Sequence, residues 1–70
     1  MIDYQTANYA VKNIHHDTAK AFLIGMKAKF ETSEMPNDEC CFSLYDMSET
    51  QAHRIHEYLE QECKAVLLPF

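Results

Sequence analysis

The chain has 70 residues, a formal net charge of −5 at pH 7, 47% hydrophobic residues and 24% charged residues. This is the composition of one globular domain, and one Gly with two Pro excludes collagen-like, glycine-loop and hairpin-rich architectures. No apolar run approaches the ~18 residues that span a membrane and no signal-peptide pattern is visible, so we expect no membrane association.

The first fourteen residues allow two interpretations. Residues 7–14 fit a strand over part of their length, and this is the interpretation we favour. Apolar side chains spaced three or four residues apart also fit a helix that Asp3 would cap.

The next segment predicts a helix over residues 18–32, with Asp17 as its N-cap. Five side chains form one apolar arc about 100° wide that should face the core: Ala19, Phe22, Leu23, Met26 and Phe30. A second, mostly small apolar strip lies opposite: Ala21, Ile24, Gly25 and Ala28. Gly inside a helix costs up to ~1 kcal/mol relative to Ala, so we expect another backbone to approach this strip closely.

Residues 33–39 contain Pro36 and predict a loop. Residues 39–47 then alternate between two sets of side chains with a period of two, which predicts a strand. Phe42 and its neighbours at every second position form the bulkier set.

A second helix begins directly afterwards. Ser48 and Gln51 match a capping box, and an apolar arc follows: Ala52, Ile55, Leu59, Cys63 and Val66. Residues 65–68 are either the helix end or a short buried strand, which would run parallel to the strand over 39–47.

Together these elements predict an α+β domain with two layers. Two amphipathic helices pack on a sheet of two or three strands in the order β-α-β-α-β, or the N-terminal segment is helical.

The cysteines argue against a disulfide framework. They are odd in number, and Cys40 and Cys41 point to opposite faces of a strand, so both cannot reach Cys63. We therefore expect a reducing, cytoplasmic environment, with Cys40 and Cys63 in the core and Cys41 open to exposure.

Chemical motifs are weak. His53 and His56 with the cysteines could hold a metal, but their spacing is not that of a zinc site. No nucleophile stands beside a base in a triad-like order, and one Gly cannot build a phosphate-binding loop. Lys20 and Lys27 do not form a continuous basic stripe with Lys29, so we expect neither an enzyme, nor a cofactor, nor nucleic-acid binding.

Association is the function that these features favour. The second apolar strip of helix 18–32 is either covered by residues 1–14 or is an interface, most simply that of a homodimer. Residues 31–70 carry a net charge of −7, and the second helix has a polar face suited to a basic protein partner: Glu49, His53, Glu57 and Glu60. Small inhibitors and adaptors of phages and mobile elements share this size and acidity, although no residue motif carries the comparison. The alternative is a metal- or thiol-dependent sensor that uses His53, His56 and the cysteines.

Overall fold

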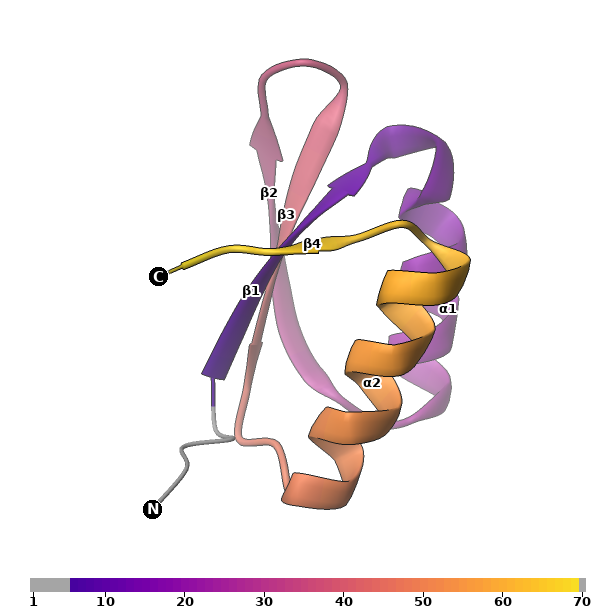
Figure 1. Cartoon of the computed structure of the whole chain (residues 1–70), viewed down its shortest axis with the longest axis vertical. Helices are drawn as coiled ribbons and strands as arrows, with labels where there is room; N and C mark the ends of the chain where they lie inside the picture. The colour runs from indigo at the N-terminus through magenta and orange to yellow at the C-terminus, as the bar shows by residue number, and fades with distance from the viewer. Residues whose placement is uncertain (1–5, 70) are drawn as a thin grey trace.

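Four strands and two α-helices follow one another in the order β-α-β-β-α-β in the computed structural model, which describes residues 6–69 (Figure 1). The elements are β1 (Thr6–Lys12), the 3-10 turn η1 (Asn13–His15), α1 (His16–Gly25), β2 (Lys29–Met35), β3 (Glu39–Tyr45), α2 (Glu49–Glu62) and β4 (Val66–Leu67). The strands form one antiparallel sheet in the spatial order β2-β3-β1-β4. This is the split βαβ arrangement, because each helix connects a central strand to an edge strand.

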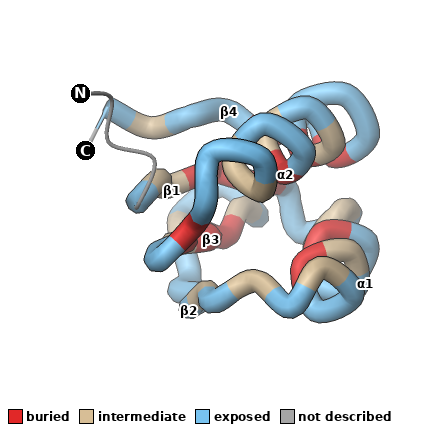
Figure 2. The backbone as a smooth tube through the Cα atoms, turned by 90° about the horizontal axis from the view of Figure 1, so that it is seen from below, coloured by how far each residue is buried: buried red, intermediate tan, exposed pale blue. Residues whose placement is uncertain are grey.

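Both helices lie on the same side of the sheet, and no helix of residues 6–69 covers the other face, which we call the open side (Figures 1 and 2). The expected class, α+β with two helices on one sheet, is confirmed. The expected order and strand number are wrong, because residues 29–35 form the strand β2 and pair with β3 along their whole length.

The N-terminal segment forms a strand, as we favoured. Tyr9 and Val11 face the helices, and they lie opposite Phe42 and Cys40 of β3. The alternative helix does not form over residues 6–12, and Asp3, its proposed cap, lies outside the described residues.

The predicted helix over residues 18–32 is wrong in its C-terminal half, and Asp17 is not its N-cap, because α1 begins at His16 and includes Asp17 in its first turn. Helix α1 ends at Gly25, where the backbone N–H of Ala28 donates to the Leu23 carbonyl and that of Lys27 donates to the Ile24 carbonyl, each at 3.0 Å. These two bonds form a Schellman motif, with Lys27 in the left-handed conformation at φ 57°. Phe30 therefore reaches the core from β2 and not from a helix.

A short turn replaces the predicted loop over residues 33–39. Strand β2 continues to Met35, and Asn37 and Asp38 reverse the chain at φ 66° and 57°. Asn and Asp tolerate this left-handed region better than most residues, so the chain makes a hairpin without glycine there. The expectation that a low glycine content disfavours hairpins does not hold at this turn.

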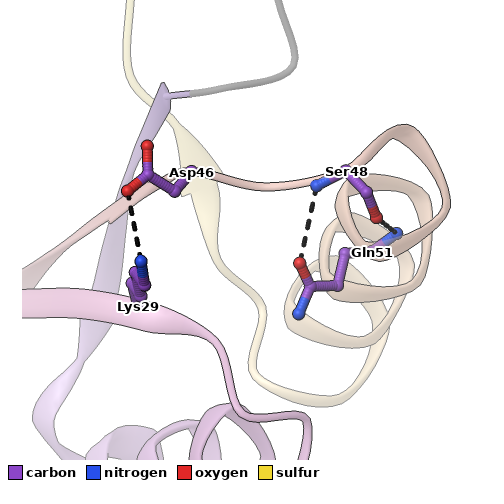
Figure 3. A network of polar contacts seen from close by, with 4 residues as sticks. All are labelled: Lys29, Asp46, Ser48 and Gln51. Atoms are coloured by element: carbon purple, nitrogen blue, oxygen red, sulfur yellow. Dashed lines mark hydrogen bonds and ion pairs between the residues drawn. The ribbon is translucent and has the colours of Figure 1, made fainter.

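The second helix follows the prediction closely. Ser48 caps α2, its Oγ accepting from the Gln51 backbone N–H at 3.2 Å while Gln51 Oε1 accepts from the Ser48 N–H at 3.5 Å (Figure 3). Gln51 Nε2 also donates to the Met26 carbonyl at 3.2 Å, which links the start of α2 to the end of α1. Beside this cap, Lys29 and Asp46 form an exposed ion pair at 3.5 Å (Figure 3).

Strand β4 runs in the same direction as β3 but pairs with β1, which lies between them. The strand alternative for residues 65–68 is thus confirmed over Val66–Leu67, but the expected burial is wrong, because both side chains are exposed at the sheet edge. Val66 is 61% exposed, so its predicted place in the inner arc of α2 is wrong, because the chain leaves the helix before reaching it.

The core lies between the sheet and the two helices. Its largest fully buried side chains are Val11, Leu23, Phe42, Leu44, Ile55, Leu59 and Cys63. Cys40 and Cys63 are buried there, as predicted, and all three cysteines are free. Cys41 is buried too, on the open side of the sheet, where its Sγ lies 3.8 Å from Ser43 Oγ.

Candidate functional site

Two adjacent exposed aliphatic side chains of the described chain lie on the sheet edge formed by β4. Val66 is 61% exposed and Leu67 is 52% exposed, and β4 pairs only with β1 within residues 6–69. An edge strand presents unpaired backbone N–H and C=O groups, and most proteins protect such an edge with charged residues or proline. Here two adjacent aliphatic side chains stand on it, with Pro69 close behind.

The residues just before and after β4 hold it in place. Lys64 turns the chain out of α2 at φ 54°, and the N–H of Ala65 donates to the Leu59 carbonyl at 2.9 Å. After the strand, the N–H of Leu68 donates to the Asn8 carbonyl at 2.8 Å. The exposed pair is therefore fixed from both sides and is not a frayed end.

The opposite edge of the sheet is built differently. Strand β2 exposes charged and hydroxyl side chains along its length: Lys29, Glu31, Thr32, Ser33 and Glu34. Charges of this kind discourage edge-to-edge pairing. The two edges thus differ in their suitability for association, because β2 carries charged side chains along its edge and β4 does not.

A groove of about 530 Å³ adjoins β4 on the helix side of the sheet. Leu67 belongs to its wall because it pairs with Tyr9, whereas Val66 pairs with Ala10 and faces the open side of the sheet. The described residues that line the groove come from β1, the β3–α2 connection, α2 and the C-terminal segment: Thr6, Ala7, Tyr9, Met47, Ala52, His53, His56, Leu67, Leu68 and Pro69.

A chain of two hydrogen bonds runs through the groove wall. The Tyr9 hydroxyl lies 2.9 Å from His56 Nδ1, and His56 Nε2 lies 2.9 Å from Glu60 Oε2. The Glu60 carboxylate can only accept, so Nε2 carries a proton, and in the neutral ring Nδ1 accepts the Tyr9 hydroxyl proton. Burial, and then the charge of Glu60, raise the pKa of Tyr9 above its ordinary value, so the phenol stays protonated.

The predicted strip on α1 is only partly assembled. Ala21, Ile24 and Gly25 lie exposed on α1, with Ile24 at 59%. Ala28 lies beyond the helix end and packs against the core, so it does not share their face. A Cβ placed on Gly25 would meet nothing within 4 Å, so the close backbone approach that we expected is wrong, and residues 6–12 pair in the sheet instead of covering the strip.

The predicted polar face of α2 is present. Glu49, His53, Glu57 and Glu60 are all exposed on it. His56 pairs with Glu60, and His53 lies 4.0 Å from Glu49 on the preceding turn. Exposed pairs of this kind contribute little to stability, so the face stays available to a partner.

The residues of the sensor alternative do not converge. Among residues 6–69 no group of three or more His, Cys, Asp or Glu side chains could hold a metal ion. Cys40 does meet a histidine, with its Sγ 3.2 Å from His16 Nδ1, beside a polar hollow of about 670 Å³. Its S–H donates to the Val11 carbonyl at 3.4 Å, and burial, with the nearby Cys41 and Glu39, raises the pKa of Cys40, so the thiol is not activated.

Sequence reasoning missed Tyr9 and Leu67 as site residues. Tyr9 was considered as part of a possible strand and, with Lys20 and Lys27, of a nucleic-acid face that we rejected; its contact with His56 joins positions 47 residues apart. The one local signal was the aliphatic run before Pro69, whose strand alternative was expected to be buried and not to form an exposed edge. No helix among the described residues is long and apolar enough to cross a membrane. Comparison with protein-family models, with curated proteins and with solved structures finds no match to this chain.

Proposed function

We propose that this protein acts by associating with other proteins through the edge of β4, without catalysing a reaction, and that a second copy is its simplest partner. The observation that carries the proposal is the pair Val66 and Leu67, exposed on a sheet edge whose strand carries no charged side chain and fixed by bonds on both sides. Addition of a strand to such an edge is a common mode of recognition.

A symmetric dimer suits this edge. Two copies related by a two-fold axis would pair their β4 strands antiparallel, so that the same surface is used twice and the contact closes. Complete burial of a Val or Leu side chain contributes about 1.5–3 kcal/mol, so covering the exposed half of four such side chains contributes about 3–6 kcal/mol. Association costs at least about 4 kcal/mol, so side-chain burial alone leaves at most about 2 kcal/mol. About two hydrogen bonds between the paired strands, at about 1 kcal/mol each, would raise this to about 4 kcal/mol, a weak dimer with a Kd of about 1 mM at best.

A basic partner would bind the same edge more tightly than a second copy. The four acidic residues of α2 that are exposed belong to the helix that leads into β4: Glu49, Glu57, Glu60 and Glu62. A partner strand that carries Lys or Arg would be steered by these carboxylates, whereas a second acidic copy is repelled. This supports an adaptor or inhibitor function toward a basic protein surface.

Three free thiols favour a reducing compartment, and we propose a cytoplasmic location on that ground.

Sedimentation equilibrium over about 10 μM to about 2 mM tests the self-association, a range that brackets the expected Kd. Val66→Lys should abolish the dimer, and the matched control Ile24→Lys, which places the same charge on α1, should leave it unchanged. A reversed result would move the interface to α1, and a monomer at every concentration would refute self-association.

Two model peptides test the partner class. A strand-forming peptide of alternating Lys and Val should shift the amide NMR signals of β1 and β4, and one of alternating Glu and Val should bind more weakly. Equal shifts from both peptides would contradict the steering by α2, and no shift from either peptide, with a monomeric protein, would overturn association at β4.

A further inference from the structure

The groove beside β4 has the size and lining of a small-molecule site. Its volume of about 530 Å³ lies within the range of ~300–1,000 Å³ that is usual for ligand pockets. Six of its described lining residues are apolar, and the polar side chains are Thr6 and Tyr9 of β1 and His53 and His56 of α2. The apolar six are Ala7, Met47, Ala52, Leu67, Leu68 and Pro69.

The hydrogen bonds from Tyr9 to His56 and from His56 to Glu60 determine whether the Tyr9 hydroxyl can donate to a ligand or accept from it. Both nitrogens of His56 are engaged, one with Tyr9 and one with Glu60. In the neutral state the Tyr9 hydroxyl spends its only proton on His56, and its oxygen keeps lone pairs that can accept. The groove therefore offers an acceptor at Tyr9 and not a donor.

The charged residues around the groove also indicate which net charge a ligand should have. None of the described lining residues is Lys or Arg, and the two histidines of the wall lie beside Glu49 and Glu60. An anionic ligand would meet these carboxylates, and a cation would lose its hydration against an apolar lining. Both effects favour an uncharged ligand.

We propose that this groove binds a neutral, largely apolar small molecule that carries one hydroxyl or N–H donor, and that the donor bonds to the Tyr9 hydroxyl oxygen. The site shares Leu67 with the edge proposed for association, but its polar group and most of its wall lie on β1 and α2, and Val66 is not part of it. Ligand binding therefore does not depend on the dimer.

Three probes of one shape test the proposal: p-cresol, which donates a hydrogen bond, 4-methylanisole, which only accepts, and toluene, which does neither. Amide NMR titrations of the whole chain should show shifts at Ala7, Ala52 and Leu67. One neutral hydrogen bond is worth a factor of about three to ten in affinity, so p-cresol should bind tighter than either other probe by that factor. Equal affinities for p-cresol and 4-methylanisole, or no shift with p-cresol up to its solubility limit, would overturn the proposal.

Two matched pairs of variants locate the site. Ala52→Leu fills the groove and should abolish binding, whereas Ala21→Leu, the same change on the exposed side of α1, should leave the affinity unchanged. His56→Leu frees the Tyr9 hydroxyl proton, so 4-methylanisole should gain and the preference for p-cresol should disappear. His53→Leu also changes the groove wall but leaves the Tyr9–His56 bond intact, and should keep the preference. If His56→Leu kept it as well, the role assigned to Tyr9 would be wrong.

Discussion

Replacement of Lys27 by glycine should stabilise this protein, although glycine usually weakens a helical sequence. Lys27 holds φ 57° at the end of α1. A non-glycine residue in this left-handed region costs about 1–2 kcal/mol, and glycine avoids that cost while losing about 0.5–1 kcal/mol in backbone entropy. We expect Lys27→Gly to raise the free energy of unfolding by about 0.5–1 kcal/mol. For a domain of this size that is a rise of roughly 2–8 °C in Tm.

Urea unfolding followed by circular dichroism measures this change, with Lys20→Gly as the control. Lys20 is exposed within α1, where glycine should destabilise by up to about 1 kcal/mol. The two variants thus change stability in opposite directions if α1 ends at Gly25. If the helix instead continued through residue 32, as the sequence pattern alone predicts, both variants would destabilise. Loss of stability in Lys27→Gly would therefore refute the Schellman ending.

Three further outcomes follow from the structure. Ser48→Ala removes the capping box of α2 and should lower the free energy of unfolding by about 1 kcal/mol in the same urea experiment, and no change would contradict the cap. Lys29→Met removes an ion pair whose side chains are 66% and 63% exposed, so it should change stability by less than about 0.5 kcal/mol, and a loss above about 1 kcal/mol would show that the pair is not solvated. Stability should fall as the pH rises above 9, because burial raises the pKa of two thiols and one phenol above their ordinary values of 9.0 and 10.0, and the native state keeps protons that the unfolded chain releases. The three groups are Tyr9, Cys40 and Cys63. Their contribution to the free energy of unfolding is fully present below pH 9 and is lost as the pH rises above it. Cys63→Ala should make this decline shallower in urea titrations carried out above pH 9.

Strand β3 and helix α2 could be predicted because their signals are local. The alternation over residues 39–47 specifies which side of β3 meets the helices, and the Ser48–Gln51 box marks the start of α2 within one turn. Such signals need no knowledge of which segments meet in space.

The end of α1 could not be predicted in the same way. Ala28 and Phe30 fit the 3.6-residue period of the preceding helix as well as the alternation of a strand. Pairing of residues 29–35 with β3 decides between them, and this contact between segments has no local signature. The turns that allow it are held by Lys, Asn and Asp in left-handed conformations, so the expected marker, glycine, is absent at Lys27, Asn37 and Asp38.

The candidate site shows the same division. The exposed face of α2 was predicted because its polar residues repeat with the helical period. The groove wall could not be predicted in this way, because Tyr9 and His56 meet only once β1 and α2 are packed together. We predicted that Val66 lies in the core because the apolar arc of α2 would include Val66 if the helix continued that far. The chain instead turns out of the helix at Lys64, so Val66 lies in β4 and not in that arc.

Association and ligand binding can be separated because the two residues of β4 face opposite sides of the sheet. Val66 lies with Ala10 on the open side, and Leu67 lies with Tyr9 on the groove side. Val66→Lys should therefore abolish self-association in the sedimentation experiment and leave the p-cresol affinity unchanged. Leu67→Lys should abolish both, since it places a charge on the edge and in the groove, whereas Ala52→Leu should remove p-cresol binding alone. Loss of p-cresol binding in Val66→Lys, in a variant whose amide spectrum is otherwise unchanged, would show that the groove forms only in the dimer and that the two surfaces are one site.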